Sequence, residues 1–415
     1  MAHDNKLHFE FPAKTKKWTM ILMVVGVIAA ALGWVADHTD HHQYWWANLL
    51  INGYFYFTVA LGALFFYAIQ YAAEVAWTAV LKRVFEAMFA FIPYGFAIIV
   101  IVLIAGQLGL HHLYHWMDPK VYIEGTPEFD SVIAKKALYF APWFFWLRVI
   151  AYGMVFIMFG RAFRKWSLQE DEVGGTDLHY KMYKKSAVFL VLFAVFSSTM
   201  AWDWLMSIDT HWFSTMYGWY LFSGMWVSAM IFATLLTIWL KKLGYLSFVN
   251  DSHIHDLGKW MFAVSMLWSY LWFCQYMLIW YSDISEEVTY FLERYENYMF
   301  GMWGIFAVNF LVPFYGLLAR DAKRNTKYLT RVGIIIFCGH FADLYMAVIP
   351  GTIHGHLEFG FGEGHHHTSF GWWFEIGMFL GFLGLFVFVV LSALAKAKLV
   401  AVKHPFLEES EHHSI

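Results

Sequence analysis

The stretch Trp18–Ala36 reads WTMILMVVGVIAAALGWVA, nineteen residues without a charged side chain. At ~1.5 Å per residue, such a helix is about 28 Å long, close to the ~30 Å hydrocarbon core of a bilayer. Comparable apolar runs recur along the chain. Of its 415 residues, 60% are hydrophobic, 21% aromatic and 14% charged, whereas about 25% are charged in soluble domains. The sequence therefore predicts an all-α integral membrane protein and excludes a soluble fold.

Hydropathy windows of about nineteen residues predict ten membrane-spanning helices. Their expected bounds are Trp18–Ala36, Asn48–Ala73, Phe85–Gln107, Tyr139–Ala162, Ala187–Met206, Trp212–Leu240, Gly258–Tyr281, Tyr298–Ala319, Leu329–Pro350 and Gly371–Lys396. The first apolar run lacks a signal-peptide cleavage site, so it is expected to be retained. Residues 1–17 and 397–415 are expected to be cytoplasmic tails around a transmembrane domain at 18–396.

The positive residues predict which side each loop faces, because Lys and Arg are retained on the cytoplasmic side during insertion. With the N-terminus inside, 23 of the 28 Lys and Arg residues fall in cytoplasmic segments. Four fall in outer loops and one, Arg148, lies within the fourth helix. The segment Arg161–Lys185 is therefore expected on the cytoplasmic side, and the loops Leu108–Leu138 and Ser282–Asn297 on the outer side.

Two halves of the chain are weakly similar to each other. The matching segments are Gly53–Phe57 with Gly218–Phe222, Met88–Ala90 with Met261–Ala263, and Asp203–Met206 with Asp343–Met346. They occur in the same order on helices that run in the same direction, as in membrane proteins built from repeats. We therefore expect two four-helix bundles, helices two to five (about 48–206) and six to nine (about 212–350), flanked by helices one and ten.

Ionisable side chains inside a span cost about 2.5 kcal/mol or more unless they face protein or water, so each is a candidate functional group. The candidates for a proton path are His340, Asp343, Asp203, Arg148, Glu74, Glu86 and Glu375. His340 and Asp343 share a helix face, so they can either pass protons near neutral pH or simply hold the ninth helix to its neighbours. Arg148 is expected to pair with Asp203, either to fix that acid's charge or as a structural ion pair.

The chain lacks the ligand patterns of common redox cofactors. Its two cysteines, Cys274 and Cys338, lie in apolar runs, and no Cys-x-x-Cys-His sequence is present. Neither covalent haem nor an iron–sulfur cluster is therefore expected. A di-haem cytochrome b needs four intrahelical histidines, whereas only His340 is central in a predicted helix. The run His365–His367 is interpreted as a polar, partner-contacting loop rather than a metal site, and no basic patch indicates nucleic acid.

The segment Asp203–Gly218 reads DWLMSIDTHWFSTMYG. It resembles the Asp-Trp-x-Met-Ser-x-x-x-His-Trp-x-Ser-Thr-x-x-Gly stretch of the large membrane subunits of bacterial alternative complex III, which are related to the NrfD or polysulfide-reductase membrane family. With ten expected helices and 415 residues, the chain is similar to the shorter, F-type subunits of that complex rather than to the longer C-type paralogues.

The resemblance implies a respiratory quinol oxidoreductase in the bacterial inner membrane. The implied partners are a paralogous ten-helix C subunit, periplasmic iron–sulfur and haem c subunits, a terminal oxidase and bound phospholipid. F-type subunits carry no redox cofactor, and the implied role is proton conduction rather than catalysis. Alternatively, this chain itself binds and oxidises menaquinol, with His111, His112 or Asp203 accepting protons. An independent secondary transporter is less favoured, because Pro93 and Pro313 are not placed symmetrically.

Overall fold

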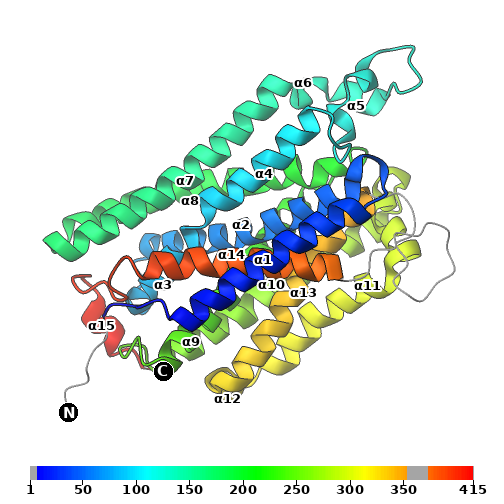
Figure 1. Ribbon diagram of the computed structural model, residues 1–415. Helices are drawn as coiled ribbons and strands as arrows, with labels where there is room; N and C mark the ends of the chain where they lie inside the picture. Colours follow the sequence, from blue (N-terminus) through cyan, green and yellow to red (C-terminus); the bar gives the residue numbers. More distant parts are fainter. Residues whose placement is uncertain (1–6, 353–372, 415) are drawn as a thin grey trace.

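The described part of the chain is largely helical. The computed structural model describes residues 7–352 and 373–414, is 81% helical and contains no strand within these residues (Figure 1). The α-helices are α1 (Ala13–Ala36), α2 (Gln43–Ala72), α3 (Lys82–Phe89), α4 (Ile92–Gln107), α5 (Ser131–Lys135), α6 (Ala137–Phe140), α7 (Pro142–Val173), α8 (Asp177–Trp204), α9 (Met216–Lys242), α10 (Asp251–Ser282), α11 (Ser285–Leu317), α12 (Arg320–Arg324), α13 (Thr326–Thr352), α14 (Trp373–Leu394) and α15 (Leu407–Glu411). Short 3-10 helices are η1 (Asp40–His42), η2 (Ala79–Leu81), η3 (His115–Met117), η4 (Pro119–Tyr122) and η5 (Met206–Ile208).

Within the described residues, ten helical segments are long and apolar enough to cross a membrane, as predicted. They are α1, α2, the η2–α3–α4 segment, α7, α8 with η5, α9, α10, α11, α13 and α14. The chain is therefore a multi-pass membrane protein. Both ends of the described chain lie at one end of the molecule, which we call the terminal face (Figure 1). The other end, which carries α5 and α6, is called the opposite face.

The third span, predicted over Phe85–Gln107, is present as one crossing over Ala79–Gln107, but its α-helix is interrupted. α3 ends at Phe89 and α4 begins at Ile92, with Pro93 in its first turn. Proline has no backbone N–H to donate to the carbonyl four residues earlier, and its ring clashes with that carbonyl. The regular α-helical hydrogen bonds are therefore broken here, although Ala90 and Phe91 keep right-handed helical backbone angles.

The connection Arg161–Lys185, predicted as a loop, is mostly helical. α7 continues to Val173 and α8 begins at Asp177, so only residues 174–176 connect them. Gly174 and Gly175 have φ angles of 73° and 80°, in the left-handed region that glycine adopts without strain. Hydropathy missed the extra turns because charged residues can continue a helix beyond the apolar core.

The predicted outer loop Ser282–Asn297 is also helical. α11 begins at Ser285 and continues through this segment into the span, with a local distortion at Tyr298, where φ is −132°. Arg294, which the sequence placed in an outer loop, is therefore a buried residue of α11.

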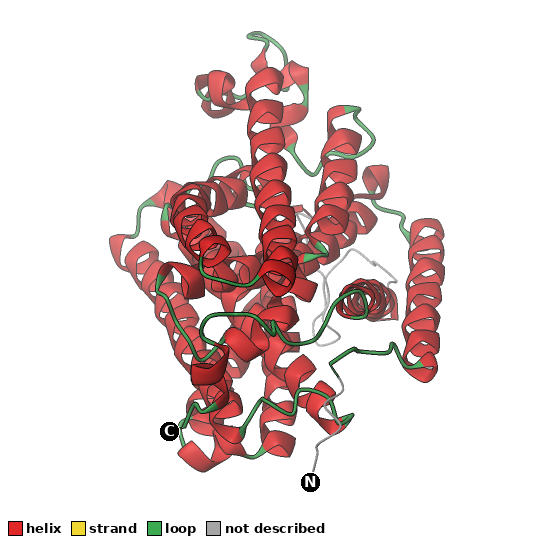
Figure 2. Cartoon of the chain, turned by 90° about the vertical axis from the view of Figure 1, so that its left-hand side faces the viewer, coloured by secondary structure: helices red, strands yellow, loops and turns green. Residues whose placement is uncertain are grey.

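The spanning helices pack around α2 and α9. α2 contacts α3, α4 and α8, and α7 contacts α4 and α8; we call these five the first helix group. α9 and α11 each contact α10 and α13; these four are the second helix group. The groups meet where α2 packs on α9, and α14 packs on α2 and α3. Seen toward the terminal face, the described chain consists of helices joined by loops (Figure 2).

α1 and α14 approach each other closely at paired glycines. A Cβ atom on Gly26 would lie 2.4 Å from the Cα of Gly381, and a Cβ on Gly377 would lie 2.4 Å from the Cβ of Ala29. Small residues of this kind let two membrane helices pack backbone to backbone, where van der Waals contact replaces the hydrophobic effect as the driving force. Gly26 and Gly381 therefore attach α1, which is otherwise exposed along much of its length, to the rest of the molecule.

Substitution of Gly381 by alanine is expected to lower the free energy of unfolding by about 1–3 kcal/mol, because overpacking a close contact forces backbone shifts. Gly304→Ala is a matched control, because nothing lies within 4 Å of a Cβ at that position. Thermal unfolding of both variants in detergent micelles measures the difference. Equal unfolding midpoints for the two variants would show that the close α1–α14 contact contributes little to the free energy of unfolding.

The segment 395–414 folds back across the terminal face (Figure 1). Its hydrogen bonds and ion pairs join Leu399 to Leu7, Lys403 to Glu172, Ser410 to Trp77, and His413 to Asp256. These partners belong to the N-terminal segment, to α7, to the loop before η2 and to α10. The segment therefore connects the first helix group to the second, and we call it the C-terminal strap.

Candidate functional site

Buried polar side chains gather in three clusters. The Asp203 cluster lies near the opposite face of the first helix group, the Glu86 cluster lies near the terminal face of the same group, and the Asp343 cluster lies inside the second group. Because buried charges are costly unless they are paired or wet, each cluster is a candidate functional site.

In the Asp203 cluster, four donors surround one buried carboxylate. Arg148 binds it bidentately, with Nε 2.8 Å from Oδ2 and Nη2 2.9 Å from Oδ1. The hydroxyls of Tyr139 and Tyr152 donate to Oδ1 and Oδ2 at 2.8 and 2.7 Å. A carboxylate offers about four acceptor positions, so this one has none left for a substrate. The expected pair is present, although Arg148 lies in the first turns of α7 and not near the middle of the span.

Phenylalanine rings separate the Asp203 cluster from the terminal face. The contacting pairs include Phe57 with Phe156, Phe65 with Phe193, Phe156 with Phe193, and Phe163 with Phe189. All of these rings are buried between α2, α7 and α8. These rings offer no hydrogen-bonding group to water or to a proton.

The Asp343 cluster contains the acid that corresponds to Asp203 in the predicted repeat. Asp343 of α13 accepts hydrogen bonds from the hydroxyl of Tyr220 at 2.5 Å and from the indole nitrogen of Trp268 at 3.0 Å. His340 is buried one turn away, and neither of its ring nitrogens has a partner among the described residues. Its ring packs edge-on against Trp268, with 5.2 Å between centroids. His340 and Asp343 thus share a face, but Trp268 contacts both and no direct hydrogen bond joins them.

A small cavity extends from Asp343 toward the opposite face. It is about 20 Å³ in volume, counted as space open to the centre of a water molecule, and its lining includes Gln275, Tyr290 and Arg294. One water needs ~10–15 Å³ on this measure, so the cavity holds about one. Arg294 donates to the carbonyls of Met346 and Ala347, and its Nη2 lies 3.7 Å from Asp209, at the opposite-face end.

Further polar groups continue from His340 toward the terminal face. Asn309 of α11 is fully buried beside Gly339, and its amide oxygen and nitrogen both lack partners among the described residues. Buried hydroxyls follow on α9 and α10: Ser228, Thr234, Ser265 and Ser269. Each donates to the backbone carbonyl four residues earlier and keeps an acceptor position free. From Asp209 to Thr234, these groups form what we call the polar column of the second helix group.

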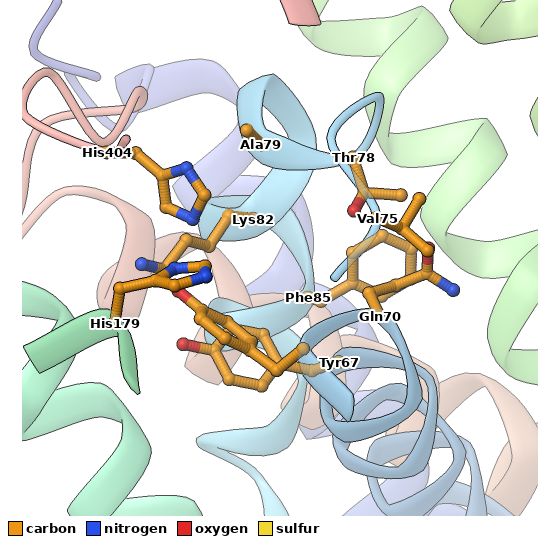
Figure 3. A pocket seen from close by; sticks show the side chains of 10 residues that line it. Tyr67, Gln70, Val75, Thr78, Ala79, Lys82, Phe85, His179 and His404 are labelled. Atoms are coloured by element: carbon orange, nitrogen blue, oxygen red, sulfur yellow. The ribbon is translucent and has the colours of Figure 1, made fainter. Parts of the chain in front are cut away.

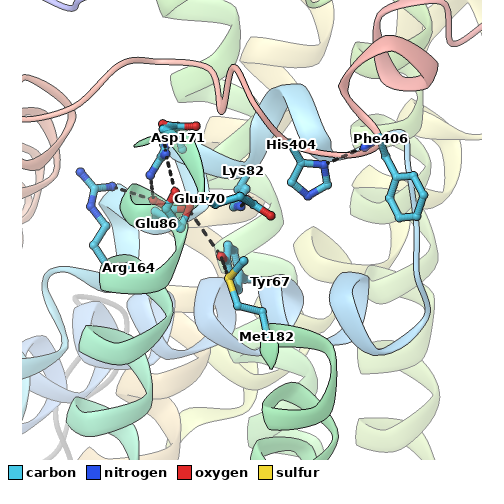
Figure 4. Close-up of polar contacts among 11 residues, drawn as sticks. Tyr67, Lys82, Glu86, Arg164, Glu170, Asp171, Met182, His404 and Phe406 are labelled. Atoms are coloured by element: carbon cyan, nitrogen blue, oxygen red, sulfur yellow. Dashed lines mark hydrogen bonds and ion pairs between the residues drawn. The ribbon is translucent and has the colours of Figure 1, made fainter. Parts of the chain in front are cut away.

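The Glu86 cluster balances three cations against three carboxylates (Figure 4). Lys82 lies 2.6 Å from Glu170, and Arg83 lies 2.6 Å from Glu86. Arg83 also pairs with Asp171, and Arg164 lies 3.2 Å from Glu86. The side chains of Lys82, Arg83, Glu86 and Glu170 are almost inaccessible, so the pairs must compensate their lost hydration.

A candidate set of metal ligands consists of Glu170 of this cluster with His179 and His404, the two histidines that line the pocket in Figure 3. Ligand atoms of Glu170, His179 and His404 lie within 4.8 Å of one another. However, the Lys82 ammonium already binds Glu170, and the backbone N–H of Phe406 donates to His404 Nδ1 at 3.2 Å. A neutral His404 with that tautomer carries its proton on Nε2, which then donates and does not ligate. Burial, with the nearby charge of Lys82, lowers the pKa of His404 to about 2. The ion pair of Glu170 and the tautomer of His404 therefore argue against a metal centre, although neither ring nitrogen of His179 has a hydrogen-bond partner among the described residues.

Comparison with known proteins identifies no family. No family model matches the chain. A search of curated proteins also finds no similar sequence. The resemblance to alternative complex III subunits therefore stays a prediction that rests on the Asp203–Gly218 segment and on the ten spans.

Two of the predicted proton-path residues lie apart from the three clusters. Glu74 is exposed in the turn after α2, with φ of 49°. Glu375 of α14 accepts a hydrogen bond from Tyr44, whose hydroxyl also lies 2.8 Å from that of Tyr345. Glu375 therefore links α14 to α2 and α13 near the opposite face. The run His365–His367 lies outside the described residues.

The alternative hypothesis, that this chain oxidises menaquinol, names His111, His112 and Asp203 as proton acceptors. Asp203 is fully occupied, as described above, and the two histidines lie in different environments. His111 is buried, with Nε2 2.9 Å from the carbonyl of Val102 and Nδ1 accepting from the N–H of Leu113. His112 is exposed and packs edge-on against His41. Burial lowers the pKa of His111 to about 4, so this ring stays neutral at physiological pH. The low pKa makes His111 a weak base and both ring nitrogens are already hydrogen-bonded, so it is poorly suited to accept a proton from quinol.

The low pKa of His111 predicts a pH-dependent stability. Between pH 6.5 and 4 the unfolded chain binds a proton at this residue and the folded chain does not, so stability is lost as the pH falls. The loss between pH 6.5 and 5 is expected to reach about 2 kcal/mol, since one proton per pH unit is worth about 1.36 kcal/mol. His111→Gln should reduce this pH dependence and the exposed neighbour His112→Gln should not. Unfolding midpoints across that pH range provide the measurement, and identical profiles would contradict the assignment.

The sequence does not single out several polar residues of the clusters as candidates. Lys82, Arg83 and Glu170 fall in or next to predicted loops, and Arg294 falls in a predicted outer loop. The spacing of Arg83 and Glu86, three residues apart just before an apolar run, was the available signal. The partners of Asp343 had no such signal, because Tyr220 and Trp268 are 123 and 75 residues away in sequence.

Proposed function

We propose that this chain is a proton-conducting membrane subunit, without a redox cofactor of its own, of a quinol-oxidising respiratory assembly of the alternative complex III type. The observation that carries the proposal is the polar column, in which the buried carboxylic acid Asp343 lies one turn from His340, whose ring nitrogens make no hydrogen bond with the described residues. Imidazole and carboxyl groups exchange protons readily when water or a hydroxyl connects them.

The contrast between the helix groups supports placing the path in the second one. In the first group, four donors occupy Asp203 and the phenylalanine rings offer no hydrogen-bonding group. In the second group, the side chains of His340 and Asn309 are buried without a hydrogen-bond partner in the part of the chain that the structure describes. Buried polar groups of this kind are usually satisfied by water. We assign Asp203 a structural role and Asp343 the titrating one.

The size of the cavity beside Asp343 favours proton conduction over quinol oxidation. Pockets for small organic ligands measure roughly 300–1,000 Å³, whereas this cavity has room for about one water. Together with the fully hydrogen-bonded His111, this makes menaquinol oxidation at Asp343 or at His111 the weaker proposal. The electron-transfer chemistry is assigned to partner subunits that carry iron–sulfur clusters and haem c.

The orientation we propose places the terminal face in the cytoplasm of a bacterial cell, because most Lys and Arg residues lie at that end of the spans. The two helix groups are proposed to be copies of one four-helix unit, flanked by α1 and α14. The opposite face would then meet the periplasmic iron–sulfur and haem c subunits, and the lipid-facing sides would meet a paralogous C subunit or a terminal oxidase.

The proposal is tested on the purified assembly that contains this chain, reconstituted in vesicles with a pH-sensitive dye. Oxidation of a water-soluble menaquinol analogue is expected to move protons across the membrane beyond those that quinol itself releases. An assembly that lacks only this chain should keep some electron transfer and lose that additional movement. Unchanged proton-to-electron ratios without the chain would refute the proposal.

A further inference from the structure

A long groove lies between α3–α4 and α7 near the terminal face. Its volume is about 810 Å³, far larger than the cavity beside Asp343. Along most of its length the walls are apolar and come from Phe89, Ile92, Ala97, Phe156, Ile157 and Gly160. Tyr94 is 54% exposed at its rim, so the groove opens on the lateral surface that faces lipid in a membrane protein.

The groove exists because two local features keep α7 away from α3 and α4. The α-helix is interrupted between Phe89 and Ile92, just ahead of Pro93. On α7, the position that faces this interruption is Gly160, and a Cβ there would only touch Phe89 at 3.6 Å. A glycine at this place leaves space that a larger side chain would fill.

Three cations line the middle of the groove on α7. They are Arg161, Arg164 and Lys165, and the acids Glu86 and Glu172 also line the groove. Arg164 is occupied by Glu86, at 3.2 Å, and by the carbonyl of Ala393. Arg161 and Lys165 are exposed, four residues apart on one helix face, and make no ion pair with the described residues. These two cations therefore lie directly on the terminal-face side of the apolar wall.

The apolar wall matches the hydrocarbon half of one membrane leaflet. On α7 it extends from Phe156 to the cation Lys165, about 14 Å at ~1.5 Å per residue. Half of the hydrocarbon core of a bilayer is about 15 Å thick. Basic residues in a pocket between membrane helices are typical of sites for anionic lipid headgroups. We propose that the groove binds one anionic phospholipid, with its acyl chains along the apolar wall and its phosphate against Arg161 and Lys165.

The test is lipid retention by the full chain, purified in detergent and measured by native mass spectrometry after addition of palmitoyl-oleoyl phosphatidylglycerol or the corresponding phosphatidylcholine. The wild-type chain is expected to retain one phosphatidylglycerol in preference to phosphatidylcholine. The double variant Arg161→Gln/Lys165→Gln should bind phosphatidylglycerol about tenfold more weakly, since each juxtamembrane cation contributes to anionic-lipid binding. The matched control Lys184→Gln/Lys185→Gln removes two exposed charges near the same face and should bind normally.

A second variant tests the apolar part of the site. Ala97→Phe adds bulk at an exposed position of the groove wall and keeps both cations, so it should also lose phosphatidylglycerol. Equal losses in the two charge variants would mean that general surface charge holds the lipid, and would overturn the proposal. Full retention by Ala97→Phe would show that only the headgroup is bound and would overturn it too. If glycerol phosphate alone displaced phosphatidylglycerol, the groove would be a site for the phosphate group without recognition of acyl chains, and the proposal would likewise be overturned.

Discussion

Asp343→Asn is expected to lower the proton movement that accompanies quinol oxidation at least tenfold while leaving assembly intact. Asparagine keeps the shape of the side chain, and its Oδ1 can still accept from Tyr220 or Trp268, but the group no longer titrates. Proton transfer by a positioned side chain typically contributes about 10²–10⁴-fold to a rate. The measurement is the proton-to-electron ratio of the reconstituted assembly, read from dye acidification and cytochrome reduction in one sample.

The matched control is Asp256→Asn. Asp256 is a buried carboxylate of the same helix group, but it pairs with Lys259 and His413 at the terminal face, outside the polar column. It should leave the ratio unchanged. If Asp343→Asn assembles normally and its ratio equals that of the control, Asp343 is structural and the path does not pass through it.

Arg148→Met is expected to have the largest effect on stability, a loss of about 3–5 kcal/mol in the free energy of unfolding. Removing one partner of a buried ion pair leaves the other charge uncompensated, and this costs more than the pair contributed. The side chain of Asp203 is fully buried, so water cannot replace the guanidinium. Thermal unfolding followed by tryptophan fluorescence in detergent gives the midpoint.

The second variant of this series removes both charges. Arg148→Met/Asp203→Asn retains an acceptor for Tyr139 and Tyr152 and should recover much of the lost stability. Arg161→Met, an exposed arginine of the same helix without an ion pair in the described chain, should change stability by no more than about 0.5 kcal/mol. Equal midpoints for Arg148→Met and Arg161→Met would show that the pair is not structural.

The spans were predictable because their signal is local. Nineteen apolar residues suffice to identify a crossing, and an acid such as Asp203 within a span requires a cation, of which Arg148 was the available one. The break at Pro93 was readable from the same principle, since proline cannot donate to the helix. The polar extensions of α7, α8 and α11 could not be predicted in this way, because hydropathy indicates where the apolar part of a helix ends and not where the helix itself ends.

The composition of the clusters was predictable only in part. Asp343 was identifiable as a lone acid in an apolar run, yet its donors come from α9 and α10, and no spacing rule connects residues that far apart. The Glu86 cluster likewise depends on the approach of α3 to α7 and on His404 of the C-terminal strap. Hydropathy predicts that segment as a cytoplasmic tail, and nothing in the sequence of a tail predicts contact with a buried site.

The C-terminal strap follows all ten spans in sequence but contacts both helix groups. During synthesis, the spans therefore enter the membrane before the segment that connects them at the terminal face exists. Until residues 403–413 emerge, the partners of the strap on α7 and α10 are unoccupied and His179 is not covered by His404. Docking of the strap therefore follows insertion of the spans, so the two helix groups are joined at the terminal face only after each has its helices in the membrane.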